Sequence, residues 1–246
     1  MRFILTVLLG LLAMPIAQAA DAPPAPFTPA QRAEIVAILR QALVSDPTIL
    51  RDAVTALQQA EAGNRDAAAS GAIEQAGAAL TANQGDPVAG NPQGDVTVVE
   101  FYDLRCPYCR RMMPVIDSLL RQDPNIRLVY KDIPILGPGS VLGARAVLAA
   151  RRQGGYAKLQ SAIMRGSAQI TDDSLHAEAQ ASGLDWTRLQ RDMADPAIAA
   201  RIKTNLDLAR ALGIDGTPAF VIGHRLVPGA VELADLQEAV AAARAR

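Results

Sequence analysis

The chain of 246 residues carries 24 Lys and Arg residues against 25 Asp and Glu residues, a net charge of −1. This near-neutral balance, without a basic run, argues against a nucleic-acid-binding protein. The length is sufficient for one medium-sized domain and an additional module. Aromatic residues make up only 4% of the chain and alanine is abundant, so we expect a largely helical protein with a small sheet.

Residues 1–20 have the pattern of a signal peptide. A positive start at Met1-Arg2 precedes an apolar stretch over 3–13, which is shorter than the roughly 20 residues of a membrane-spanning helix. Ala17-Gln18-Ala19 is a small-x-small cleavage signal. We therefore expect cleavage after Ala19 or Ala20 and export to a compartment in which disulfides form. A retained membrane anchor is the alternative.

Residues 27–82 are predicted to form an N-terminal helical module. Thr28 and Gln31 provide a helix start with a capping box, and Asp46-Pro47 begins a second helix. The remainder, 58–82, is rich in Ala, Gln and Glu but is loosened by three glycines. Because little in the module covers its apolar helical faces, it either packs on the next domain or associates with copies of itself. A simple spacer helix is the alternative.

The second module, 86–243, begins with a strand–helix–strand unit. β-branched and aromatic residues at 96–102 and apolar residues at 126–131 predict two strands, and the helical pattern between them implies that the strands are parallel. Residues 139–212 have helical patterns throughout. The sheet resumes over 219–227, before a closing helix. We expect an α/β domain with a mixed sheet of four or five strands and a helical insertion.

Both cysteines of the chain lie in Cys106-Pro107-Tyr108-Cys109, between the first strand and the crossover helix. Unpaired N–H groups and the dipole at a helix N-terminus favour a thiolate over a thiol. Cys106 is therefore the predicted nucleophile and is expected to be exposed, with basic residues on either side. Cys109 is predicted to be the more buried resolving thiol. A C-x-x-C pair beside a βαβ pattern is typical of a thioredoxin-like redox site that works through a mixed disulfide.

Two other interpretations of the cysteine pair are weaker. Structural zinc requires four nitrogen or sulfur ligands, but the chain has no second cysteine pair, and His176 and His224 are remote from the motif. A purely structural disulfide would close a very short loop and remove little entropy from the unfolded chain. Neither a metal nor another cofactor is therefore expected.

Glu100 precedes the motif on the strand at 96–102. Strand alternation places it on the face of Val96 and Val98, which favours burial. A buried carboxylate there can take the proton from Cys109 when the mixed disulfide resolves. Lys131, at the end of the next strand, is a candidate partner for it. Two solvated charges at strand ends are the alternative.

Thr217-Pro218 directly precedes the apolar strand at 219–222 and is a candidate cis peptide. A cis-proline opposite the dithiol would expose the Thr217 backbone to an extended substrate, as in strand addition. An ordinary trans proline at a strand start is the alternative. We assign substrate binding to both residues and to Pro107 and Tyr108.

With these motifs in place, residues 86–243 resemble the DsbA family of thioredoxin-fold proteins. The resemblance rests on Phe101-Tyr102-Asp103 and on the segments at 133–137 and 216–220. It implies a nucleophilic Cys106 that forms a redox disulfide with Cys109, a cis Pro218 and a buried Glu100. Tyr108 and Thr217 depart from the DsbA oxidase and are more similar to ScsC proteins, associated with copper tolerance, or to DsbC-type isomerases. Residues 27–82 are similar to the ScsC N-terminal segment, which makes an oligomer in some members.

The expected function is that of a periplasmic thiol–disulfide oxidoreductase acting on exported proteins. An oligomeric isomerase or reductase, kept reduced by a membrane partner of the DsbD type, competes with a monomeric oxidase recharged by a partner of the DsbB type. A copper-tolerance protein that holds Cu(I) with the two thiolates is the alternative from another class. Glutaredoxins share the Cys-Pro-Tyr-Cys motif, but the export signal and the helical insertion argue against that family.

Overall fold

The computed structural model describes residues 27–82, 85–166 and 169–245. The expected signal peptide, residues 1–20, lies outside the described residues. The described residues divide into two compact units, with the boundary between Gln58 and Gln59. Among these residues, no helix combines the length and the apolar character that a membrane crossing requires.

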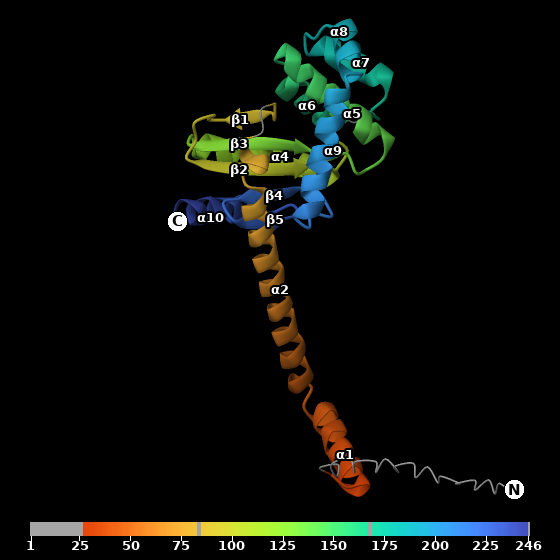
Figure 1. Cartoon of the computed structure of the whole chain (residues 1–246), viewed down its shortest axis with the longest axis vertical. Helices are drawn as coiled ribbons and strands as arrows, with labels where there is room; N and C mark the ends of the chain where they lie inside the picture. Colours follow the sequence, from red (N-terminus) through yellow and green to blue (C-terminus); the bar gives the residue numbers. More distant parts are fainter. Residues whose placement is uncertain (1–26, 83–84, 167–168, 246) are drawn as a thin grey trace, which may run out of the picture. The chain divides into compact units, whose positions relative to one another are not determined.

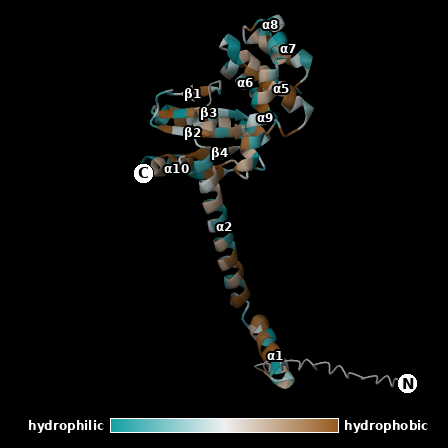
Figure 2. Cartoon of the chain, in the orientation of Figure 1, coloured by the Kyte–Doolittle hydropathy of each residue, from teal (hydrophilic) through white to brown (hydrophobic). Residues whose placement is uncertain are grey.

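The smaller unit contains α1 (Pro29–Ser45) and the first part of α2 (Thr48–Ala76). Its predicted capping box is confirmed, because Thr28 Oγ1 accepts from the Gln31 amide and Gln31 Oε1 accepts from the Thr28 amide. No residue of α1 is buried, and Figure 2 shows hydrophobic residues along this helix in brown. The exposed large apolar side chains of the unit are Phe27, Ile35, Val36, Ile38, Leu39, Leu43, Val44, Ile49, Leu50, Val54 and Leu57.

α2 is longer than the glycines in its sequence suggest. It continues through Gly63 and Gly71 to Ala76, because the Ala, Gln and Glu residues around both glycines are strong helix formers. It ends at Gly77, whose φ of +44° is accessible to glycine without steric cost. A last turn, α3 (Ala78–Thr81), follows and buries Leu80 in the core of the larger unit.

The larger unit is built on one mixed five-stranded sheet in the order β1-β3-β2-β4-β5, which confirms the predicted α/β architecture. Figure 1 shows the strands one above another in this order, with β1 at the top and β5 at the bottom. β2 and β3 are parallel, and the other three pairings are antiparallel. The strands are β1 (Val88–Gly90), β2 (Val96–Tyr102), β3 (Ile126–Asp132), β4 (Ala219–Ile222) and β5 (Arg225–Pro228).

The helices follow the predicted plan, with a crossover helix, a helical insertion and a closing helix. Within the larger unit, the insertion lies beyond one end of the sheet in Figure 1. The helices are α4 (Pro107–Gln122), α5 (Pro138–Ala150), a 3₁₀ turn (Arg151–Gln153), α6 (Tyr156–Arg165), α7 (Asp172–Ala181), α8 (Trp186–Met193), α9 (Pro196–Ala211) and α10 (Leu233–Arg244).

Both faces of β2 are covered, which explains its nearly continuous apolar sequence. Val96 and Val98 pack with residues of α4 and α10. Val99 and Phe101 point to the other face, where they pack with Leu80 and with residues of α9. Period-2 alternation therefore divides the strand into two buried sets of side chains.

Lys131 belongs to a buried ion cluster on the α9 side of the sheet. Its Nζ lies 2.5 Å from Asp86 Oδ2 and donates to the Ala79 carbonyl at 2.8 Å, and Arg201 contacts the other Asp86 oxygen at 2.8 Å. The expected pairing of Lys131 with Glu100 is therefore wrong. Lys131 lies opposite Phe101 in the β2–β3 register, and Glu100 lies opposite Tyr130, so the two charges point to different faces.

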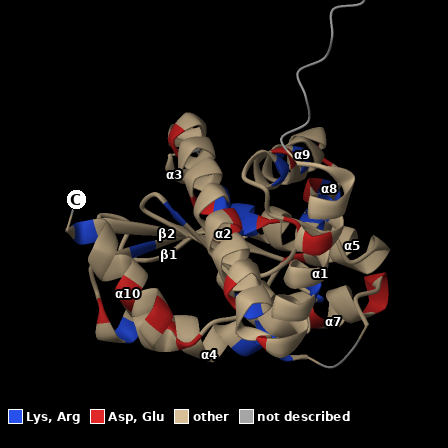
Figure 3. Ribbon diagram, turned by 90° about the horizontal axis from the view of Figure 1, so that it is seen from below, with Lys and Arg blue, Asp and Glu red and all other residues tan. Residues whose placement is uncertain are grey.

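Surface charges of both signs alternate over the larger unit, as Figure 3 shows. Arg244 near the end of α10 contacts Asp95 at 2.7 Å and Asp123 at 2.6 Å. These contacts join the closing helix to the start of β2 and to the end of α4.

Replacing Asp86 by alanine is expected to lower the free energy of unfolding by about 3–5 kcal/mol, because the buried Lys131 ammonium loses its carboxylate. Urea denaturation measures this loss. Asp207→Ala, which removes the exposed partner of Lys203 and Arg210, is the control and should cost far less. An equal cost for the two variants would contradict the structural role of Asp86.

Candidate functional site

The two thiols lie at the N-terminus of α4. Cys106 is the N-cap residue, Pro107 occupies the first helical position, and Cys109 lies in the first turn. Cys109 is fully buried, as predicted, but Cys106 is only 4% exposed. The expectation of an exposed Cys106 is therefore wrong. Its side chain packs in a core cluster that includes Tyr102 and Leu104.

The Thr217-Pro218 peptide contacts the side chain of Cys106. The bond is cis, as the sequence suggested, and Cys106 Sγ donates to the Thr217 carbonyl at 3.2 Å. Thr217 lies 111 residues after Cys106, directly before β4. This contact therefore joins the dithiol to a second, distant segment of the chain and forms the centre of the candidate site.

The three arginines near the motif contact groups other than the thiols. Arg105 donates to the Leu136 carbonyl at 2.6 Å, and Arg110 donates to the Gly166 carbonyl at 3.0 Å. Arg111 lies 4.4 Å from the centre of the Tyr108 ring. The positive end of the α4 dipole, rather than these arginines, is therefore the source of positive potential at Cys106.

Asp103 organises the loops around the dithiol, a role that the sequence analysis missed. Oδ1 accepts from the Arg105 amide and the Ser140 hydroxyl, both at 2.8 Å. Oδ2 accepts from the amides of Ile135 and Leu136 at 2.8 and 3.0 Å. An aspartate two residues before a turn amide is a local signal for such a bond, but its contacts with the 135–140 segment depend on the fold.

Three large side chains are exposed at the start of α4 and on the segment whose amides Asp103 binds. Tyr108 is 52% exposed, and Ile135 and Leu136 are each 43% exposed. They offer a contact surface beside the reactive sulfur that does not require a specific polar partner.

Glu100 is 2% exposed and lies on the predicted face of β2. Burial, followed by the negative charge of Asp132, raises the pKa of Glu100 to about 8. Burial also raises the pKa of Cys109 far above its ordinary value, with the charges of Glu100 and Cys106 adding to the effect. Cys109 is therefore held as a thiol, and Glu100 is a carboxyl group near it that can exchange a proton near neutral pH.

Asp132, at the end of β3, is a second buried carboxyl that the sequence analysis did not identify. It is 2% exposed, and burial raises its pKa to about 7 although hydrogen bonds from Tyr102 and Tyr156 oppose the rise. Its position two residues after Tyr130 places it on the Glu100 face. Strand alternation therefore carried the signal, but the helical insertion that buries it could not be placed from the sequence.

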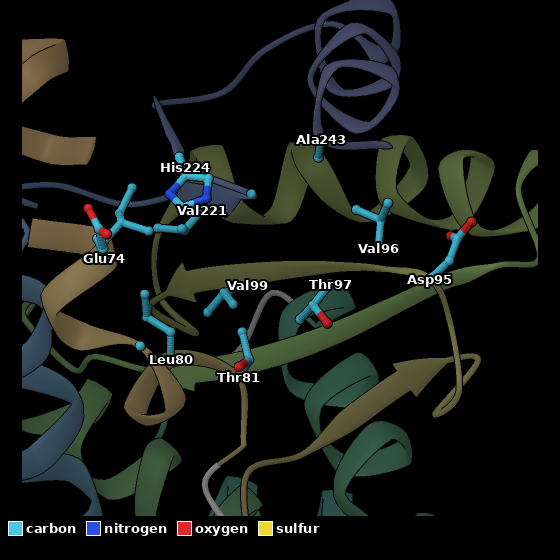
Figure 4. Close-up of a pocket in the computed structure, with 13 residues that line it drawn as sticks. Glu74, Leu80, Thr81, Asp95, Val96, Thr97, Val99, Val221, His224 and Ala243 are labelled. Atoms are coloured by element: carbon cyan, nitrogen blue, oxygen red, sulfur yellow. The ribbon is translucent and has the colours of Figure 1, made fainter. Parts of the chain in front are cut away.

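A hollow of about 380 Å³ lies on the other face of the sheet. Figure 4 shows Val99 and Val221 of the sheet together with Leu80, Glu74 and His224 around it. Neither cysteine lines this hollow. Among the described residues, no group of three or more His, Cys, Asp or Glu side chains is arranged to hold a metal ion.

Two family models match the chain. One, described as a DSBA-like thioredoxin domain, matches residues 97–241, which include the dithiol, Glu100 and Thr217. The other, described as the copper resistance protein ScsC N-terminal domain, matches residues 31–62, which include most of α1 and the first half of α2.

The chain is also similar to solved structures and to segments of longer proteins. A thioredoxin-like oxidoreductase from Silicibacter pomeroyi is 48% identical with a TM-score of 0.68, over 69% of this chain and 98% of that one. A linker-deletion mutant of Proteus mirabilis ScsC is 28% identical with a TM-score of 0.67, over 91% and 99%. The Na⁺/H⁺ antiporter NhaA 1 of Salinispora arenicola is 32% identical over 160 residues, 64% of this chain and 24% of the antiporter. The chain thus spans about a quarter of the length of the antiporters that it matches.

The stability of the fold should decline as the pH rises, because Glu100 binds its proton more tightly in the folded state. Its pKa rises from an ordinary value of 4.5 to about 8, so its contribution is complete below pH 4.5 and is lost as the pH increases toward 8. Glu100→Gln should raise the free energy of unfolding at pH 8 by roughly 2–4 kcal/mol and leave it nearly unchanged at pH 4.5.

Chemical denaturation at several pH values tests this expectation. Asp132, whose pKa is raised to about 7, also lowers the stability as the pH rises, so the comparison is made between variants at each pH. Glu238→Gln, at an exposed position of α10, is the control. A gain at pH 4.5 as large as the gain at pH 8 would contradict a buried, protonated Glu100.

Proposed function

The chain belongs to the family of DSBA-like thioredoxin domains, and we propose that it works in the periplasm as an oligomeric disulfide isomerase of exported proteins. Membership confirms the resemblance drawn from the motifs and supports thiol–disulfide exchange as the activity of the chain. The contact between Cys106 Sγ and the Thr217 carbonyl is the observation that carries the proposal, because it places the nucleophile beside a backbone segment on which an extended substrate can pair.

The proposed reaction begins with the Cys106 thiolate. It attacks one sulfur of a substrate disulfide, a mixed disulfide forms, and the other substrate sulfur leaves as a thiolate with the electron pair. In isomerisation, another substrate thiolate attacks the mixed disulfide and releases Cys106. In reduction, Cys109 gives its proton to Glu100 and attacks Cys106 Sγ. That step forms the Cys106–Cys109 disulfide and releases the substrate as a thiolate.

Substrate binding is assigned to Pro107, Tyr108, Thr217 and Pro218. The Tyr108 ring is exposed two residues after Cys106. Ile135 and Leu136 are exposed too, and the Leu136 carbonyl binds Arg105, the residue before Cys106. An apolar surface combined with backbone pairing suits unfolded or misfolded cysteine-containing segments of varied sequence. These contacts would favour segments with hydrophobic residues next to the cysteine.

The smaller unit supports the oligomeric form of the proposal. Its large apolar side chains are exposed along α1 and the start of α2, and a second copy of the same helices would cover them. We assign residues 27–82 to self-association and residues 86–243 to catalysis, with the helical insertion at 139–212. A membrane reductant of the DsbD type would keep the dithiol reduced, whereas a DsbB-type partner would serve an oxidase.

Mass measurement in solution and refolding of scrambled ribonuclease test this proposal together. The full chain without residues 1–20 should be an oligomer and should restore ribonuclease activity. Leu39→Glu/Leu43→Glu should give a monomer that loses at least about 10-fold of the isomerase rate but still reduces a small disulfide. Gln41→Glu, on the same helix, is the control for added charge.

A monomeric protein without isomerase activity would overturn the proposal in favour of the oxidase. Cys106→Ser should abolish exchange in every assay, since it removes the nucleophile. Exchange that persists in this variant would contradict the assigned site.

Copper(I) binding is a second candidate function, favoured by the match of residues 31–62 to a domain of a copper resistance protein. Soft thiolates prefer Cu(I), and Cys106 and Cys109 lie on one helical turn. Titration of the reduced protein against a competing chelator should give one tight site that disappears in Cys106→Ser/Cys109→Ser. An unchanged affinity in the double variant would exclude the thiols as ligands.

A further inference from the structure

Glu100 and Asp132 lie on the same face of the sheet. In the parallel pairing of β2 with β3, Glu100 is opposite Tyr130, and Tyr102 is opposite Asp132. The two carboxyl residues are thus diagonal neighbours. The spacing between strands and the rise per residue place their Cα atoms roughly 8 Å from each other. Both are 2% exposed. The lysine of this strand, Lys131, is bound to Asp86 on the opposite face.

A cavity of about 170 Å³ opens on this face between α4 and α6. Glu100, Tyr102 and Tyr130 line it, together with the exposed Asp117 and Arg165, whose side chains are 50% and 68% exposed. The cavity therefore extends from a buried carboxyl to the solvent. Its volume exceeds the roughly 10–15 Å³ that one water needs, so several waters can occupy it.

The Tyr102 phenol connects the cavity to Asp132, and the Tyr156 phenol contacts both Tyr102 and Asp132. Tyr102 Oη donates to Asp132 Oδ1 at 2.6 Å, Tyr156 Oη donates to Oδ2 at 3.1 Å, and the two phenol oxygens are 2.7 Å apart. Tyr102 also lines the cavity beside Glu100. Its hydroxyl is thus placed to relay a proton between the cavity and Asp132.

We propose that Glu100 and Asp132 act as one carboxyl pair that stores a single proton between them and exchanges it with Cys109. The inference rests on the proposed thiol–disulfide exchange and adds Asp132 to it as a positioning residue. Two negative charges on one buried face repel each other, so the loss of a proton from one carboxyl strengthens the hold of the other on its own proton.

The stored proton allows the resolving step to run in both directions. With the proton on Asp132, Glu100 is ionised and accepts the thiol proton as Cys109 attacks Cys106 Sγ. The new disulfide forms, the substrate leaves as a thiolate, and the excess proton leaves through water in the cavity. In the reverse direction, a substrate thiolate attacks Cys106 Sγ of the disulfide, and the departing Cys109 sulfur takes the proton from Glu100. The pair then regains a proton through water in the cavity.

The pair has a defined set of titratable neighbours. They are Cys109 and Asp117 from α4, Tyr102 from β2, Tyr130 from β3, Tyr156 and Arg165 from α6, and Asp86 before β1. Burial and the Asp132 charge are the causes that raise the pKa of Glu100. Removal of that charge is therefore the direct perturbation.

Carboxyl ¹³C signals of the reduced full chain, followed by NMR between pH 5 and 10, test the pair without a substrate. In Asp132→Asn, the titration midpoint of Glu100 should fall by on the order of one unit, because the like charge is gone. Tyr156→Phe removes a hydrogen bond that favours ionised Asp132. The proton should then move toward Asp132, and the midpoint of Glu100 should fall as well.

The decay of a mixed disulfide between Cys106 and a chromophoric aryl thiol gives the kinetic readout. Its pH profile should shift down together with the Glu100 midpoint in both variants. Asp173→Asn, which removes an exposed carboxyl of α7, should change neither quantity. Tyr156→Phe keeps both carboxyls and decides the question if Asp132→Asn does not fold.

A Glu100 midpoint that stays unchanged when Asp132 or its hydrogen bond is altered would overturn the carboxyl pair. If such a protein still exchanges disulfides, the proposed function stands without it. Shifted midpoints in a protein whose Cys106→Ser variant retains exchange would instead overturn the proposed function and leave the pair intact.

Discussion

The pairing of β2 between β3 and β4 is the constraint on which the site depends. β2 leads through Asp103 to Cys106 at the start of α4, and β4 begins directly after the Thr217-Pro218 peptide. The antiparallel register, with Phe101 opposite Ala219, brings the Thr217 carbonyl to Cys106 Sγ. A slip of one residue would send every β2 side chain to the other face, so sheet pairing fixes both the approach to the thiol and the position of Glu100.

The two faces of β2 and β3 carry buried charges with different roles. On the α9 side, Lys131, Asp86 and Arg201 form an ion cluster. Lys131 also binds the Ala79 carbonyl of α3. On the other side, Glu100 and Asp132 lie near the resolving thiol. Because adjacent residues of one strand alternate between these faces, a stabilising charge and a proton-exchanging charge can be neighbours in sequence without neutralising each other.

Local patterns predicted most of the elements and part of the site. The capping box at Thr28, the strand–dithiol–helix unit, the buried Glu100 and the cis Pro218 were all expected from the sequence. The pairing of Lys131 and the burial of Cys106 were not, since they depend on a segment before β1 and on the loop before β4. Asp103 and Asp132 were missed for a similar reason: the 135–140 segment that binds Asp103 and the helix α6 that helps to bury Asp132 are brought near only by the fold.

The central claim is that Cys106 exchanges disulfides with exported proteins. Trapping in cells with a Cys109→Ala variant is the most direct test, because the mixed disulfide at Cys106 can no longer be resolved by the second thiol. The account predicts reducible adducts of the variant with cysteine-containing exported proteins, and their absence when Cys106 is also replaced by serine. A variant that accumulates no adducts, or adducts that form without Cys106, would contradict the account.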